Sequence, residues 1–197
     1  MREPAIDILD RPLPYAGHLG ARALHDIDLV VIHCTELPDL ATAREYGERV
    51  LYPHSRSGNS GHYYIDRDGR IERWVAETRI AHHVRGMNAH SLGIELVNRG
   101  RWPDWLDSRN QAMDEPYAEA QIAALIALLR ALHARLPALA RIAGHDELDT
   151  ETVEASDDPS RRVCRKRDPG PRFPWARVLA GSPLVRIGQA ALPPDER

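Results

Sequence analysis

Residues 28–33 read Asp-Leu-Val-Val-Ile-His, a β-branched apolar run with polar residues at both ends. A run of this kind is typical of a strand that is buried in a sheet. It ends on His33, whose polar side chain follows the apolar residues directly. The stretch therefore predicts a buried strand that presents a histidine at one edge of the sheet.

Two further stretches carry strand signals. Residues 63–66 and 70–75 flank Arg-Asp-Gly, in which Asp-Gly supplies the positive φ of a tight hairpin turn. Residues 91–98 read Ser-Leu-Gly-Ile-Glu-Leu-Val-Asn, so that Glu95 points away from the face of the alternating apolar side chains. We expect an antiparallel pair of strands, followed by a strand with a carboxylate on its other face.

Helical patterns separate these strands. Residues 40–51 have a helical composition, and Asp39 is placed to cap the N-terminus of that helix. The clearest helix covers residues 115–136, is opened by Asp114 and Pro116, and carries an apolar stripe of Ile122, Leu125, Leu129, Leu132 and Leu136. This stripe must pack on the sheet, which indicates an α/β fold.

The composition excludes several classes of protein. A length of 197 residues fits a single domain. The net charge of −3 and the lack of a Lys and Arg run argue against nucleic-acid binding. No segment approaches the roughly 18 apolar residues that span a bilayer, and two cysteines are too few for a disulfide framework. The first 18 residues hold no signal-peptide stretch, which favours the cytoplasm and leaves a periplasmic or secreted protein open.

Histidines follow two of the predicted strands. His33 ends the first strand, and His145 follows the short strand at residues 141–143. In open α/β sheets ligands gather beyond the strand ends, and imidazole is a common zinc ligand. The alternative interpretation is that both are ordinary polar residues at strand ends.

A carboxylate and an ammonium come from residues 165–171, Arg-Lys-Arg-Asp-Pro-Gly-Pro. Pro169 biases Asp168 toward an extended conformation, and Lys166 lies two residues earlier, on the same side of an extended chain. Two histidines and Asp168 would make a three-ligand zinc site with an open fourth position. Lys166 is the single lysine among 26 basic residues, which suggests a role that arginine cannot fill. The alternative is a structural turn with solvated charges.

The two cysteines are less informative. Cys34 follows His33 in an extended run, so its side chain should point the opposite way, into the core. Cys164 is a rival third metal ligand, although it lies outside the segment that holds Lys166 and Asp168.

Residues 31–35, 91–96, 144–145 and 166–171 together resemble the zinc N-acetylmuramoyl-L-alanine amidases. This family includes phage amidase-type lysozymes, animal peptidoglycan recognition proteins and bacterial anhydromuramyl-peptide amidases. The four motifs occur in family order, and the resemblance runs from about residue 29 to residue 175. Each motif alone is weak, but four in order are specific.

The resemblance implies a central mixed β-sheet flanked by α-helices, with one Zn²⁺ per chain bound by His33, His145 and Asp168. Glu95 matches the acidic residue that bacterial members place over the zinc-bound water, and Lys166 matches their catalytic lysine. The implied reaction cleaves the amide between the lactyl group of N-acetylmuramic or anhydromuramic acid and the L-alanine of the stem peptide. Peptidoglycan or a muropeptide would be the partner, and the protein would act as a monomer.

Further residues follow from the same resemblance. Gly61 stands where phage and animal members carry a functional tyrosine, which points to the bacterial branch that uses a glutamate. His83 and Asn88 match positions that contact substrate. Residues 147–164 form a longer stretch than the family pattern, either a lid or wall for the substrate groove or a tolerated surface insertion.

We expect residues 1–27 to form an N-terminal extension that packs on the amidase catalytic domain, residues 28–180, with residues 181–197 as a surface tail. Two other functions remain open. A zinc peptidase should carry a His-Glu-x-x-His helix, which this sequence lacks. A peptidoglycan-binding module that does not cut would lack a ligand, yet all three candidate ligands are present.

Overall fold

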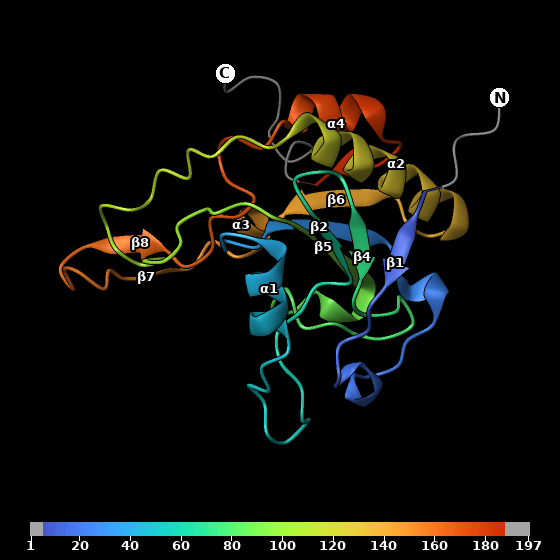
Figure 1. Ribbon diagram of the computed structural model, residues 1–197, viewed down its shortest axis with the longest axis horizontal. Coiled ribbons are helices and arrows are strands. Elements are labelled where there is room, and N and C mark those ends of the chain that lie inside the picture. The colour runs from blue at the N-terminus through green and yellow to red at the C-terminus, as the bar shows by residue number, and fades with distance from the viewer. Residues whose placement is uncertain (1–5, 188–197) are drawn as a thin grey trace.

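The computed structural model describes residues 6–187, which form one α/β unit around a mixed sheet of seven strands (Figure 1). Only the β3–β4 pair is antiparallel, and the other neighbours run parallel. In spatial order the strands are β1 (Ile8–Asp10), β4 (Ile71–Arg73), β3 (Tyr63–Ile65), β5 (Ser91–Leu96), β2 (Leu29–Cys34), β6 (Arg141–Gly144) and β9 (Val185–Arg186). The mixed sheet and the single domain are therefore confirmed.

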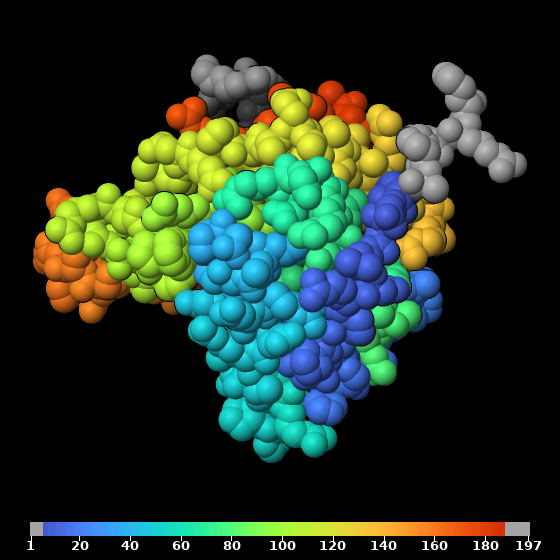
Figure 2. All heavy atoms as spheres, in the orientation of Figure 1, coloured from blue at the N-terminus to red at the C-terminus, as the bar shows by residue number. Residues whose placement is uncertain are grey.

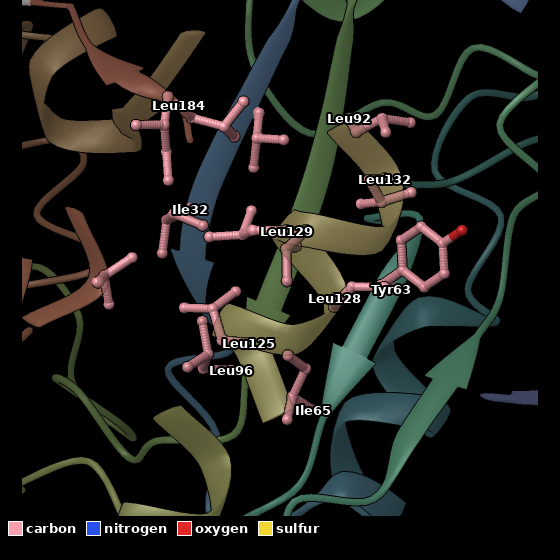
Figure 3. Close-up of a cluster of buried hydrophobic side chains, with 14 of the residues drawn as sticks. Ile32, Tyr63, Ile65, Leu92, Leu96, Leu125, Leu128, Leu129, Leu132 and Leu184 are labelled. Carbon is pink, nitrogen blue, oxygen red and sulfur yellow. The ribbon is translucent and has the colours of Figure 1, made fainter. Parts of the chain in front are cut away.

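Helix α2 (Glu119–Arg135) covers one face of this sheet. Its buried leucines pack against apolar side chains of the central strands, as Figure 3 shows for Leu125, Leu128, Leu129 and Leu132 beside Ile32 and Leu96. Helix α4 (Trp175–Gly181) extends the same layer through Val178. The apolar stripe read from the sequence therefore packs as predicted.

The opposite face carries the polar residues of the central strands. β2 and β5 are parallel, and Ile32 pairs with Ile94 on the α2 side. Because side chains alternate along a strand, the next pair, His33 and Glu95, faces the other way. Helix α1 (Leu40–Gly47) lies on this second side, where Leu40 joins a cluster around the stacked rings of Tyr64 and Trp74.

The predicted starts of the two helices agree with the structure to different degrees. Asp39 caps α1 as expected, because its side chain accepts the Thr42 N–H at 2.7 Å. The start of α2 at residue 115 was wrong, since the helix begins at Glu119. Glu115 is held outside the helix, because its backbone carbonyl accepts from Asn98 and its carboxylate pairs with Arg67. These contacts keep the preceding segment extended.

Residues 147–164, the stretch that is longer than the family pattern, contain regular structure. After the short helix α3 (His145–Leu148), β7 (Thr152–Glu154) and β8 (Arg162–Cys164) form an antiparallel hairpin. Asp157 at its tip accepts hydrogen bonds from the backbone and hydroxyl of Ser108. The hairpin and the loop around residue 108 lie together as an arm at the left of Figures 1 and 2.

Both flanks of the chain contribute edge strands. β1 pairs with β4, and Leu13 and Tyr15 just after it are buried. β9 pairs with β6, so residues 185–186 of the expected surface tail belong to the sheet; residues 188–197 lie outside the described residues. The predicted division into extension, domain and tail stays a prediction. Among residues 6–187, no helix has the length and apolar character needed to cross a membrane.

Candidate metal centre and active site

Three predicted ligands meet at one point. His33 Nδ1, His145 Nδ1 and Asp168 Oδ2 lie 2.9 to 3.0 Å from one another. β2 and β6 are adjacent and parallel, with Ile32 opposite Gly144. The residues that follow this pair, His33 in β2 and His145 at the start of α3, therefore lie at the same edge of the sheet. The Asp146 N–H donates to the Asp168 carbonyl at 2.9 Å. This hydrogen bond holds the turn that carries Asp168, the third candidate ligand, against α3.

This arrangement fits a metal ion. Ligand atoms of a tetrahedral zinc site, at 2.0–2.1 Å from the ion, stand about 3.3 Å apart, close to the spacing seen here. All three side chains are buried, with exposed fractions of 2% to 3%. Asp168 Oδ1 is also buried and has no hydrogen-bond partner among the described residues, which leaves it available to a cation. Nitrogen and oxygen donors of this kind suit Zn²⁺.

The protonation states agree with metal binding. Burial, reinforced by His145, lowers the pKa of His33 to about 4, so its imidazole is neutral at pH 7. Burial opposes ionisation of Asp168, but the neighbouring His145 and His33 hold its pKa well below the usual range. Neutral imidazole and ionised carboxylate are the forms that bind metal.

Neither cysteine belongs to this group. Among residues 6–187, His33, His145 and Asp168 form the one cluster of His, Cys, Asp and Glu side chains with metal-binding spacing. Cys34 is buried, as expected from its alternation with His33. Cys164 lies on β8, so the rival ligand assignment has no support in the geometry.

Glu95 lies beside the metal ligands on β5, directly opposite His33 in the register of β2 and β5. Burial, and next the negative charge of Asp168, raise the pKa of Glu95 to about 8. Gly61 makes room for this side chain, since a Cβ at position 61 would come within 2.8 Å of Glu95 Cγ. A proton acceptor with a pKa near neutrality is suited to general acid–base catalysis.

Lys166 lines the same cavity and is partly buried. Its positive charge contributes to the lowered pKa of His33, and it partly opposes the rise in the pKa of Glu95. Within residues 6–187, its ammonium group forms no hydrogen bond or ion pair with another side chain. The charge is therefore available to a substrate.

A buried ion pair that the sequence did not indicate supports the chain segment that carries Lys166. Arg101 donates to both carboxylate oxygens of Glu36, at 2.6 and 2.9 Å, and to the Cys164 carbonyl at 2.9 Å. It thus links the end of β2 to the chain two residues before Lys166. Glu36 and Arg101 are 65 positions apart, and no local pattern in the sequence connects them.

His83 and Asn88, the predicted substrate contacts, both line the cavity. His83 Nδ1 lies 3.0 Å from His33 Nε2, so this histidine contacts a candidate metal ligand. The Asn88 side-chain oxygen accepts the backbone N–H groups of His83 and Val84 at 3.0 and 2.8 Å. Asn88 therefore holds the loop that carries His83.

The cavity has a volume of about 910 Å³, within the range of sites for ligands larger than single sugars or amino acids. The three candidate metal ligands, Glu95 and Lys166 all line it. Tyr46, Leu51, Tyr52 and Trp105 supply apolar surface to the same cavity. A ligand with both polar and apolar parts would fit such a site.

Comparison with known proteins agrees with this geometry. Residues 23–171 match the Amidase_2 family, described as N-acetylmuramoyl-L-alanine amidase. The chain belongs to this family. The match covers the metal triad, Glu95 and Lys166, and it confirms the resemblance read from the sequence motifs.

Three matches, to the two relatives AmiD and AmpD, cover most of this chain. N-acetylmuramoyl-L-alanine amidase AmiD of Escherichia coli K12 is 36% identical over 136 residues, which are 65% of this chain and 41% of AmiD. The crystal structure of a selenomethionine AmpD derivative has a TM-score of 0.63 and 26% identity over 89% of this chain and 94% of that chain.

The third is the complex of E. coli AmiD with the substrate anhydro-N-acetylmuramic acid-L-Ala-D-γ-Glu-L-Lys. It has a TM-score of 0.57 and 26% identity, and covers 82% of this chain and 60% of that chain. The amidase-family chain spans 41% to 56% of the length of the curated relatives that it matches.

Proposed function

We propose that this chain is a zinc hydrolase that cleaves the amide between the lactyl group of N-acetylmuramic or anhydromuramic acid and the L-alanine of a stem peptide. One Zn²⁺ would be held by His33, His145 and Asp168. The observation that carries the proposal is the convergence of these three buried ligands beside Glu95 and Lys166 in one cavity. Family membership and the AmiD complex with an anhydromuramyl peptide supply the substrate class.

Each residue has a distinct task in this reaction. A zinc ion held by His33, His145 and Asp168 would supply Lewis acidity, which would lower the pKa of a water toward about 7 and polarise the amide carbonyl. Its positive charge would favour the ionised form of Glu95, and this carboxylate, on the strand next to His33, would take the proton that the attacking water gives up. The Lys166 ammonium donates to the oxygen on which negative charge develops, a role worth roughly 3 to 4 kcal/mol. The leaving amine takes its proton from Glu95 or from Lys166.

The two alternative functions account for less of the site. A binding module that does not cut would require neither a carboxyl group with a raised pKa nor a free ammonium beside three metal ligands. A zinc peptidase of other specificity would use the same groups on another amide. Product analysis separates these functions.

The test is mass spectrometry of products after incubation with two substrates: anhydro-N-acetylmuramic acid-L-Ala-D-γ-Glu-L-Lys, and intact peptidoglycan sacculi. We expect free tripeptide and anhydromuramic acid from the first substrate. Cleavage elsewhere in the peptide would favour a peptidase, and binding without products would favour a non-catalytic module. The monomeric state and the cytoplasmic location stay predictions.

A further inference from the structure

We infer that Ser91 and His83 form a hydrogen-bond relay that fixes the metal-binding tautomer of His33. The inference rests on the proposed metal centre and concerns what prepares one of its ligands. Ser91 and His83 would be positioning residues, because they act through His33 and do not touch the reacting atoms.

The relay is a continuous row of four groups. The Ser91 hydroxyl lies 2.8 Å from the Met87 carbonyl and 3.2 Å from His83 Nε2. His83 Nδ1 in turn lies 3.0 Å from His33 Nε2. The other nitrogen of His33, Nδ1, is the one that meets His145 and Asp168. Every ring nitrogen in the row therefore has at least one polar neighbour.

The protons in this row can be assigned from chemistry. A carbonyl can only accept, so the single hydroxyl proton of Ser91 points to Met87, its shorter contact. The Ser91 oxygen must then accept a proton from His83 Nε2. A buried neutral imidazole carries one N–H, which leaves a lone pair on His83 Nδ1. That lone pair accepts the Nε2–H of His33, and His33 Nδ1 is left with a lone pair for the metal.

The opposite direction of the row would block the site. If Ser91 donated to His83 instead, His83 Nδ1 would carry the proton and would donate to His33 Nε2. His33 would then carry its own proton on Nδ1, where the metal should bind. Metal-ligating histidines commonly have their tautomer fixed by a partner on the other ring nitrogen. Here that partner is a second histidine, whose own tautomer is fixed by Ser91.

The backbone leaves space for the relay at a single glycine. A Cβ at Gly93 would lie 2.6 Å from His83 Cγ, so the imidazole occupies the volume that a side chain would fill. Gly93 pairs with Val31 in β2, two residues before His33, which brings the His83 ring within reach of the ligand. In the motif Ser91-Leu92-Gly93, the serine therefore supplies the acceptor for His83 Nε2 and the glycine supplies the space.

The relay also gives His83 a task other than substrate contact. Its Nδ1 faces His33 and its Nε2 faces Ser91, so both ring nitrogens are engaged inside the protein. Asn88, which accepts the His83 backbone N–H, holds the ring's loop in place.

The first experiment measures zinc affinity by competition with a chelator in wild type and Ser91→Ala, and does not depend on activity. We expect Ser91→Ala to weaken zinc binding by about 10- to 100-fold, the usual effect of removing an outer partner of a metal ligand. Ser60→Ala is the matched control, since Ser60 is another buried serine and is outside the relay. It should keep the wild-type affinity.

The second experiment reads the tautomer of His83 by ¹⁵N NMR of the zinc-loaded wild-type protein. We expect His83 to carry its proton on Nε2. A proton on His83 Nδ1, or a folded Ser91→Ala variant with wild-type zinc affinity, would overturn the relay while the proposed function stands. A wild-type chain that binds no zinc would overturn the metal centre and the relay together.

Discussion

His33 and Glu95 are directly paired residues on the neighbouring parallel strands β2 and β5. The pairing turns both side chains to the face opposite helix α2, so a candidate metal ligand and a carboxyl group share one polar surface. The position of Glu95 is thus set by the register of the two most central strands. Its role in the proposed reaction can be tested without disturbing the fold.

Glu95→Gln should leave zinc content and fold unchanged and lower kcat by about 100-fold or more, as expected for loss of a general base. The amide side chain has the same shape but cannot take a proton at neutral pH. Steady-state kinetics on an anhydromuramyl tripeptide provide the measurement. A variant with nearly full activity would remove Glu95 from the mechanism.

Gly61→Ala should lower kcat by about 10-fold, because the added Cβ would press on Glu95 Cγ from 2.8 Å and move the carboxyl group. Gly17→Ala is the matched control, since a Cβ at Gly17 would meet no atom within 4 Å. Equal rates for the two variants would show that the position of Glu95 does not depend on Gly61.

Lys166→Ala should lower kcat by about 100- to 1,000-fold with little change in KM, because its hydrogen bond strengthens only in the transition state. Lys166→Arg should also be slow, since a forked guanidinium is larger than an ammonium and cannot give up its proton. Kinetics of both variants separate this role from that of a surface charge. Wild-type kcat in Lys166→Arg would contradict the need for an ammonium.

The stability of the metal-free protein should depend on the ionisation of Glu95. Burial raises its pKa from 4.5 to about 8 on folding, so the folded state favours the protonated form. This contribution to stability is present below pH 4.5 and is lost as pH rises through about 8. Glu95→Gln stays neutral, so its Tm relative to wild type should rise between pH 5 and pH 8. Thermal unfolding in the presence of a chelator checks this, and a Tm difference that is the same at both pH values would show that the carboxyl group titrates normally.

Much of the fold follows from local patterns in the sequence. The apolar run before His33, the alternation around Glu95 and the hairpin at Asp68-Gly69 all depend on neighbouring residues, and each lies where it was expected. The hairpin β7–β8 and the edge strands β1 and β9 are only two or three residues long. Strands this short form through pairing with distant segments and leave no periodic signal.

The site shows the same division. The candidate ligands and Glu95 lie in or next to predicted strands, or in short motifs. The sequence alone could therefore identify them. The Arg101–Glu36 pair and the contact of His83 with His33 join residues 65 and 50 positions apart. Such contacts depend on the tertiary fold, and for that reason the sequence indicated His83 only as a substrate contact.

The most direct test of the central claim is the zinc content of the purified chain, measured by elemental mass spectrometry, in wild type and in Asp168→Ala. We expect one zinc per wild-type chain and a large loss of zinc in Asp168→Ala. In that variant the two remaining histidines leave a buried cation site without its carboxylate. Circular dichroism of both proteins controls for folding. A folded Asp168→Ala variant with unchanged zinc content would contradict the assignment of His33, His145 and Asp168 as the metal centre.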